Sequence, residues 1–129
     1  MKIQHVAGLA VSMTVGVGIG AIAVQSLHAQ AKPPVYYITE IDTSSLDTYM
    51  KDYAPVAQKT IKDSGGRVVA AGVPQSVEGD PPKARVVVLV WDSAEKIQAW
   101  RGSAEYKAAR ETGDKLAKFR SYTVNGLSQ

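Results

Sequence analysis

The sequence RVVVLVW, residues 85–91, decides how the rest of the chain is expected to fold. After Arg85 every residue is apolar, and most are β-branched valines, which favour an extended strand. Successive side chains of a strand point to opposite faces, so a strand that is apolar throughout is expected to be covered on both faces. Helices of the same chain can cover one face, and we expect a second copy of the chain to cover the other.

Three other segments are predicted to be strands. Residues 35–42, VYYITEID, are rich in β-branched and aromatic residues, and residues 67–72 and 119–126 are the other two. Residues 72–84 contain three prolines and two glycines, which is typical of a loop between strands. The sequence thus predicts four strands, of which residues 85–91 form the most apolar.

Two segments between the strands are predicted to be helical. In residues 43–63 apolar side chains recur at intervals of three and four, as on one face of a helix. Pro55 is expected to kink this helix or to end its first part, because it lacks a backbone donor. Residues 92–118 are predicted to form two helices, because Gly102 interrupts the run and Ser103 can cap the second helix.

The glycine pair after the first helix has two possible explanations. Gly65 and Gly66 precede Arg67, and a glycine pair followed by a cation occurs in phosphate-binding loops as well as at helix ends. No helix is predicted to begin after the pair, so no N-terminal amides would face a phosphate. We therefore assign Gly65 to a left-handed helix cap and Gly66 to the turn into the next strand. Only Arg67 remains as a candidate for chemistry.

The predicted order is strand, helix, strand, strand, helix, strand. With right-handed crossovers this order gives an α+β, ferredoxin-like fold, in which a four-stranded antiparallel sheet carries both helical segments on one face. The other face of the sheet then needs cover. A two-fold homodimer that packs sheet against sheet, as a dimeric α+β barrel, would supply it.

Residues 1–31 are predicted to be an export signal. Lys2 precedes an uncharged, largely apolar segment, residues 6–24, and small residues follow at the expected exit site. Cleavage is expected after Ala31, with Ala29 as the second choice.

The alternative is an uncut inner-membrane anchor, because residues 6–24 nearly reach the roughly 20 residues that span a bilayer. In either case residues 32–34 form a short leader and residues 35–129 form the folded domain. The predicted localisation is periplasmic or secreted, and the chain would contact the membrane only if the N-terminal segment stays uncut.

Several kinds of active site need side chains that the predicted domain lacks. The chain has no cysteine, and both histidines, His5 and His28, lie in the predicted signal. We therefore expect no zinc held by Cys and His, no Ser-His-Asp relay, and no haem on a proximal His or Cys. Only a Tyr-ligated haem or an all-carboxylate metal site would remain, and no spacing in the sequence suggests either. We predict no metal and no cofactor.

The charge pattern bears on the partners of the chain. Fifteen Lys and Arg against 12 Asp and Glu give a net charge of +3, and the two signs alternate along the sequence. Nucleic-acid binding needs cations clustered on one face, so no nucleic-acid partner is expected.

A set of residues spread over the whole predicted domain resembles a known family. The residues are Tyr36-Tyr37-Ile38 with Asp42, Tyr53, Gly65-Gly66-Arg67, Glu78-Gly79, Arg85 leading to Trp91, Trp100, Ser103, Glu105-Tyr106 and Arg110. In this order they are similar to the domain of unknown function 1330 family, a branch of the dimeric α+β-barrel superfamily. Two features depart from the family: Trp91, where members often have phenylalanine, and the export segment.

The resemblance implies a ferredoxin-like fold and a homodimer, but no established activity. Relatives in the superfamily include cofactor-free monooxygenases that act on aromatic polyketides, lactone isomerases and haem enzymes. The resemblance also implies that a ligand would lie between the sheet and the helices. The candidate ligand-binding residues are then Tyr37, Arg67, Arg85, Trp91, Trp100, Tyr106 and Arg110.

These candidates suit a planar anionic organic molecule, because aromatic rings stack and guanidinium groups form paired hydrogen bonds with anions. Each candidate has a structural alternative, since the tryptophans can be core residues and the arginines can face solvent or pair with acids. Any acid–base step would fall to Tyr, Asp, Glu, Lys or Arg. Glu40 and Asp42 are the acids on the first strand.

Three functions stay open on this basis. They are small-molecule binding, a cofactor-free monooxygenase- or isomerase-like reaction, and a non-catalytic periplasmic interaction module. A cavity of about 300 Å³ or more with converging Arg and Tyr side chains favours the first two. A closed apolar interior favours the third.

Overall fold

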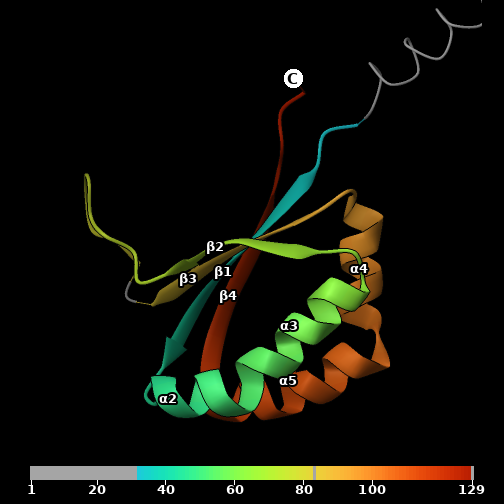
Figure 1. Cartoon of the computed structure of the whole chain (residues 1–129). Helices are drawn as coiled ribbons and strands as arrows, with labels where there is room; N and C mark the ends of the chain where they lie inside the picture. The colour runs from blue at the N-terminus through green and yellow to red at the C-terminus, as the bar shows by residue number, and fades with distance from the viewer. Residues whose placement is uncertain (1–31, 83, 129) are drawn as a thin grey trace, which may run out of the picture. The chain divides into compact units, whose positions relative to one another are not determined.

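The computed structural model describes residues 32–82 and 84–128 (Figure 1). The predicted export signal, residues 1–31, lies outside the described residues. Within the described ranges, no helix combines the length and the apolar character that crossing a membrane requires. All the described helices and strands belong to a unit that begins at Pro33.

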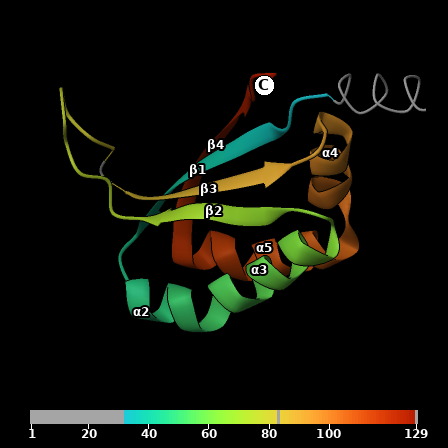
Figure 2. The same cartoon turned by 45° about the horizontal axis from the view of Figure 1, so that its top comes forward.

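Four strands form one sheet with the spatial order β2-β3-β1-β4, and each neighbouring pair is antiparallel. The strands are β1 (Val35–Thr43), β2 (Arg67–Gly72), β3 (Arg85–Trp91) and β4 (Ala117–Asn125). The helices are α2 (Leu46–Thr48), η1 (Tyr49–Tyr53), α3 (Ala54–Asp63), α4 (Ala94–Gly102) and α5 (Ala104–Leu116). They lie on one face of the sheet (Figures 1 and 2). The predicted ferredoxin-like α+β fold is confirmed.

The face of the sheet toward the helices is buried. On β1 every second residue from Val35 to Ile41 is buried, and the residues between them are partly exposed. The strand register places Leu89 of β3 and Thr123 of β4 beside Tyr37, so these residues share its face. The alternation read from the sequence therefore sets which side of β1 meets the helices.

The opposite face, here called the outer sheet face, carries no described helix (Figure 2). Its apolar residues are Tyr36, Ile38, Val86, Val88, Val90, Tyr122 and Val124. Tyr122 and Val124 are 43% and 51% exposed. The chain's own helices thus cover only one of the two sheet faces that the sequence predicts to be buried.

The first helical segment runs without a break from Leu46 to Asp63, so it does not end at Pro55, and a kink there stays a prediction. Pro55 lies in the first turn of α3 and has no backbone N–H to donate to the carbonyl of Lys51. The turn before it is a π-helix, η1, which is a wider turn that often accompanies a functional site. The rings of Tyr49 and Tyr53 on this turn are both buried and point into the interior.

The glycine pair ends α3 as a Schellman cap. Gly65 has a positive φ of 88°, and its N–H donates to the Lys62 carbonyl, while the N–H of Gly66 donates to the Ile61 carbonyl. The predicted left-handed cap is confirmed for Gly65. Gly66 has a further role that the sequence did not show, since a Cβ there would clash with the indole of Trp91.

Trp91 and Trp100 form the centre of the core. Trp91 is only 1% exposed, its ring centroid lies 4.7 Å from that of Trp100, and the ring of Tyr106 lies 4.1 Å beyond. Both indole N–H groups have acceptors: Trp91 Nε1 donates to Ser64 Oγ (3.1 Å) and Trp100 Nε1 to Thr60 Oγ1 (3.0 Å). The core is thus aromatic, and its buried polar atoms are paired.

Candidate functional site

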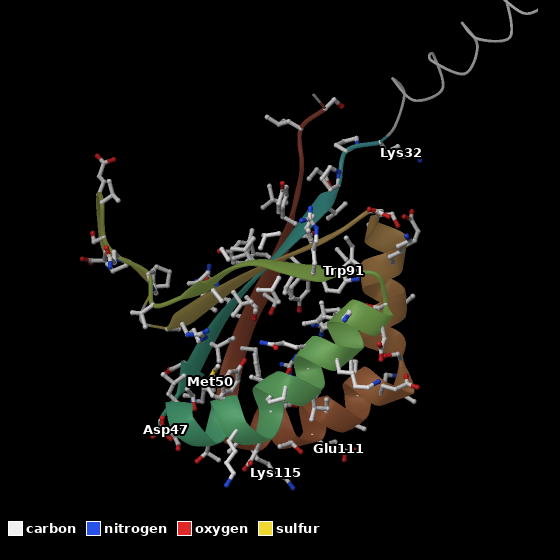
Figure 3. The ribbon with its side chains drawn as sticks, in the orientation of Figure 1. Lys32, Asp47, Met50, Trp91, Glu111 and Lys115 are labelled. Atoms are coloured by element: carbon white, nitrogen blue, oxygen red, sulfur yellow. The ribbon has the colours of Figure 1, made fainter. Side chains whose placement is uncertain are left out.

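A narrow cavity, here called the core slot, lies between the sheet and helices η1, α3 and α5. Its volume is about 70 Å³. Four of the residues that line it are exposed, and these are Met50, Gln58, Val68 and Ala71. They mark its entrance, which lies between the helices η1 and α3 on one side and the edge strand β2 on the other. Met50 lies on the side of its helix toward the sheet, whereas Glu111 and Lys115 point away from the interior (Figure 3).

Five of the seven sequence candidates line the core slot. They come from β1, β3, α4 and α5, and are Tyr37, Arg85, Trp100, Tyr106 and Arg110. The fold thus brings together residues that are far apart in the sequence. Their role in binding a ligand stays a prediction.

The other two candidates lie elsewhere. Trp91 is enclosed in the aromatic core, beyond the residues that line the slot. Arg67 begins the edge strand β2 and lines a separate shallow depression beside α3. Glu40 and Asp42 also lie outside the slot, on the outer sheet face, where Glu40 Oε2 is 3.8 Å from Arg120 Nε.

The slot also contains two tyrosines, Tyr49 and Tyr53, that were not among the predicted ligand-binding residues. Burial raises the pKa of Tyr49 to about 12, although nearby Arg85 acts in the opposite direction. Burial raises the pKa of Tyr53 further, and it also raises the pKa of Tyr106 above its ordinary value. All three phenols therefore keep their protons at neutral pH and act as hydrogen-bond donors, not as general bases. Their four-residue helical spacing from Tyr49 to Tyr53 was the only signal in the sequence.

Arg110 is held in place by three contacts. Its Nη1 donates to the hydroxyl of Tyr106 (2.8 Å), and its Nε donates to Asp114 Oδ1 (2.7 Å). The guanidinium carbon lies 3.9 Å from the ring centroid of Phe119, within the range of a cation–π contact. The predicted alternative, that Arg110 pairs with a neighbouring acid, is therefore correct, and the residue lines the slot as well.

Arg101, which sequence reasoning missed, does not line the core slot but contacts Tyr37, a residue that does. Its Nη1 donates to the hydroxyl of Tyr37 (2.6 Å), and its guanidinium carbon lies 5.7 Å from the ring centroid of Tyr106. The available signal was its position one helical turn after the buried residue Ile97, on the same face of α4. Its neighbours on this face, Ile97 and Trp100, are apolar, so Arg101 was not among the residues predicted to bind a ligand.

The residues of the slot suit hydrogen bonding and stacking better than metal chemistry. Within the described residues, no group of three or more His, Cys, Asp or Glu side chains could hold a metal ion. No carboxylate lines the core slot. The arrangement can therefore donate hydrogen bonds to an oxygen-rich or anionic ligand, and it can place aromatic rings against a flat one.

The volume of the slot limits what it holds in this conformation. A water molecule occupies about 30 Å³ in the liquid, and sites for organic ligands span about 300–1,000 Å³. The 70 Å³ of the core slot is closer to the first figure. The cavity is thus smaller than a site for an organic molecule was expected to be. Its converging Arg and Tyr side chains are the groups that such a site was expected to contain.

Solved structures of low sequence identity share the fold. A protein of unknown function from Rhodopseudomonas palustris has a TM-score of 0.59 at 14% identity, over 83% of this chain and 93% of that one. SnoaB, a cofactor-independent oxygenase from Streptomyces nogalater, has a TM-score of 0.57 at 11% identity, over 75% and 96%. A candidate antibiotic biosynthesis monooxygenase from Nitrosomonas europaea has a TM-score of 0.54 at 17% identity, over 76% and 93%. These likenesses establish the fold and leave the activity open.

Sequence comparison gives the family directly. No curated protein matches the chain. Residues 34–127 match the family described as a domain of unknown function, DUF1330, and this span contains all the described helices and strands. The resemblance read from the residues is thus confirmed, and the chain belongs to the DUF1330 family.

Proposed function

We propose that this chain is an exported homodimer that binds a small, planar, anionic organic molecule in the core slot of each protomer. The observation that carries the proposal is the convergence of polar groups on an otherwise apolar cavity. These groups are the hydroxyls of Tyr49, Tyr53 and Tyr106 and the guanidinium groups of Arg85 and Arg110. A few directed polar groups in an apolar pocket are what fixes the orientation of a small ligand.

The slot has to widen to admit such a ligand, and its entrance is suited to this. Met50 is unbranched and flexible, so it can adopt another rotamer at little cost. Gln58, Val68 and Ala71 beside it are exposed, and β2 is an edge strand with an irregular register between Val68 and Ala70. An edge strand that is paired on one side only can move without breaking the centre of the sheet.

The homodimer is supported by the outer sheet face. Seven apolar residues of β1, β3 and β4 lie there, and no described helix covers them. Val90 is already buried within the protomer, while Tyr122 and Val124 are exposed. A second copy that presents the same face would bury both patches around a two-fold axis. The resemblance to the dimeric α+β-barrel superfamily favours the same arrangement.

Export is supported by the sequence of residues 1–31 alone, through its order of basic start, apolar middle and small-residue exit. The domain would then work in the periplasm or outside the cell. An uncut inner-membrane anchor is the alternative for the same segment.

Two observations favour other functions. The likeness of fold to a cofactor-independent oxygenase favours a cofactor-free monooxygenase- or isomerase-like enzyme. The small volume of the core slot favours a non-catalytic interaction module. Because the tyrosines of the slot keep their protons at neutral pH, they cannot abstract a proton, and the enzyme would have no evident base. This favours the interaction module over the enzyme.

Native mass spectrometry of the protein purified from the periplasm of its own host tests the proposal. A dimer of a chain that begins near Lys32, carrying an additional bound mass, is the expected result. A monomer would overturn the sheet-to-sheet assembly, and a chain that still begins at Met1 would overturn the cleavage.

Blocking the entrance tests the slot itself. Ala71→Phe places a large ring at the entrance on an exposed position of β2, and Ala108→Phe places the same ring on an exposed position of α5 away from the slot. With 2-naphthoate as the probe in a fluorescence titration, Ala71→Phe is expected to weaken binding at least about tenfold, which corresponds to about 1.4 kcal/mol. Equal binding by both variants would place the ligand outside the slot, and absence of 2-naphthoate binding to the wild type would favour the interaction module.

A further inference from the structure

A second hollow, here called the β4 pocket, lies between α4, α5 and β4. Its volume is about 400 Å³, and it is an open depression of the surface, as shallow as the one beside Arg67, whereas the core slot is narrower and more enclosed. Tyr37, Arg110 and Phe119 line both cavities, so their side chains form the wall between the two. Ile97 and Arg101 complete the side that α4 provides.

The β4 pocket is lined by two guanidinium groups and by no carboxylate. Arg110 has a partner in Asp114, to which its Nε donates. Arg101 has no carboxylate partner among the residues that the structure describes, and its recorded hydrogen bond goes to the neutral hydroxyl of Tyr37. The pocket therefore has an excess positive charge that the described part of the chain does not neutralise.

Hydrogen-bond donors in the pocket also exceed acceptors. The oxygen of Tyr37 already accepts from Arg101, so its O–H proton is free to donate to a third group. The guanidinium of Arg101 carries five N–H donors in a planar fork, of which one is used. Such a surplus of donors around a cavity is matched by a ligand that brings acceptors only, and an ionised carboxylate is such a group.

The far wall of the pocket is polar and accessible. Ser121 and Thr123 lie on the side of β4 that faces the helix layer, yet both are exposed, because α4 and α5 leave the second half of this strand uncovered. The hydroxyl of Ser121 donates to Thr39 Oγ1 (2.8 Å), which fixes its position. Phe119 offers half-buried apolar surface beside these hydroxyls, whereas Ile97, at 4% exposure, forms the closed floor of the hollow.

We propose that the β4 pocket binds the carboxylate of a small organic acid between Arg101 and the hydroxyl of Tyr37, with the apolar part of the acid against Phe119. The planar fork of Arg101 can receive both carboxylate oxygens, which a lysine could not do. The site is separate from the core slot, so it does not require the slot to widen. Because Arg110 lines both hollows, a ligand that shifts this side chain in one of them would also change the wall of the other.

Titration of benzoate into the purified protein, with its neutral counterpart benzamide as the matched probe, tests this inference by calorimetry. Benzoate is expected to bind and benzamide to bind at least about tenfold more weakly, since a hydrogen bond to a charged group is stronger than one to a neutral group. Arg101→Gln is expected to weaken benzoate binding by about the same factor. Lys107→Gln removes the same charge from an exposed position that lines neither cavity, and it is expected to leave binding unchanged.

The entrance variant Ala71→Phe separates the two sites. Benzoate binding that persists in Ala71→Phe and is lost in Arg101→Gln supports the β4 pocket, whatever the fate of the core slot. Loss of benzoate binding in Ala71→Phe would place the acid in the core slot and overturn the inference. Equal affinity for benzoate and benzamide, equal affinity in wild type and Arg101→Gln, or no benzoate binding at all would overturn it as well.

Discussion

The two faces of the sheet are equally apolar along β3 but have different surroundings. Leu89 and Trp91 point to the helix side and lie against the chain's own helices, whereas Val86 and Val88 point to the outer side, where no described element lies. The residue types of the two sets are similar, so a strand's composition shows that a face needs cover without showing which chain provides it. If the proposed homodimer forms, one strand would support the fold with one face and the assembly with the other.

This comparison assigns different consequences to substitutions on the two faces. Changes on the helix side should lower the free energy of unfolding of each protomer, because they open or overfill a packed core. Changes on the outer side should alter the association of protomers and leave the fold in place.

Trp91→Ala is expected to have the largest effect on stability. Trp91 is 1% exposed and packs on Trp100, so its removal leaves a cavity and should cost about 3–5 kcal/mol of unfolding free energy. Urea denaturation followed by circular dichroism measures the loss. Tyr122→Ala removes an aromatic ring from the outer sheet face and should cost the protomer under about 1 kcal/mol when both variants are measured at a concentration at which the protein is monomeric. Similar losses in the two variants would break the distinction between the faces.

Gly113→Ala should have an intermediate effect. A Cβ at Gly113 would lie 2.6 Å from the ring of Tyr53, so the ring must shift, at a cost of about 1–3 kcal/mol. Alanine's higher helix propensity offsets roughly 1 kcal/mol of this. Gly102→Ala is the control, because no atom lies within 4 Å of the Cβ that it adds. A thermal midpoint for Gly113→Ala at or above that of Gly102→Ala would mean that the wall of the core slot is not tightly packed.

Ile38→Lys should change the assembly more than the fold. Ile38 lies at the centre of the outer sheet face, opposite Val88 on one side and Tyr122 on the other. A lysine there would put a charge in the proposed dimer interface, where burial without a partner is unfavourable. Sedimentation velocity is expected to show monomers for Ile38→Lys and dimers for Val77→Lys, a matched change at a fully exposed loop position. A dimer in both variants would mean that the protomers associate through another surface.

Local signals in the sequence were sufficient for much of the fold. Gly65 as a left-handed cap depends on the backbone properties of a single residue, so it was predictable without tertiary information. The alternation along β1 likewise set the buried side of the sheet. Each of these features is decided within a few residues of the chain.

The candidate site was predictable only in part, because it depends on how elements rotate and pack. Arg85 and Arg110 were found from a resemblance, and Tyr49 and Tyr53 were seen as an apolar stripe without their place around a cavity. Arg101 was missed because its contact with Tyr37 joins α4 to a distant strand. No pattern in the sequence gives the volume of the core slot, which is set by side-chain packing on all of its walls.

The smallest expected effect concerns the stability of the protein in alkali, and it again separates the two faces. Tyr49 faces the core slot with a pKa raised to about 12 by burial, whereas an unfolded chain would release this proton near the ordinary pKa of about 10. Between these values the unfolded state binds fewer protons than the folded state, so the contribution of Tyr49 to stability is present below pH 10 and is lost as the pH rises toward 12.

Tyr49→Phe has no phenol to ionise and should lose less stability than the wild type over this window. Val124→Ala, on the outer sheet face, removes no ionisable group and should follow the wild type. Urea midpoints measured at pH 8, 10 and 11 test this, and a wild-type slope retained by Tyr49→Phe would mean that the phenol reaches solvent through an open slot.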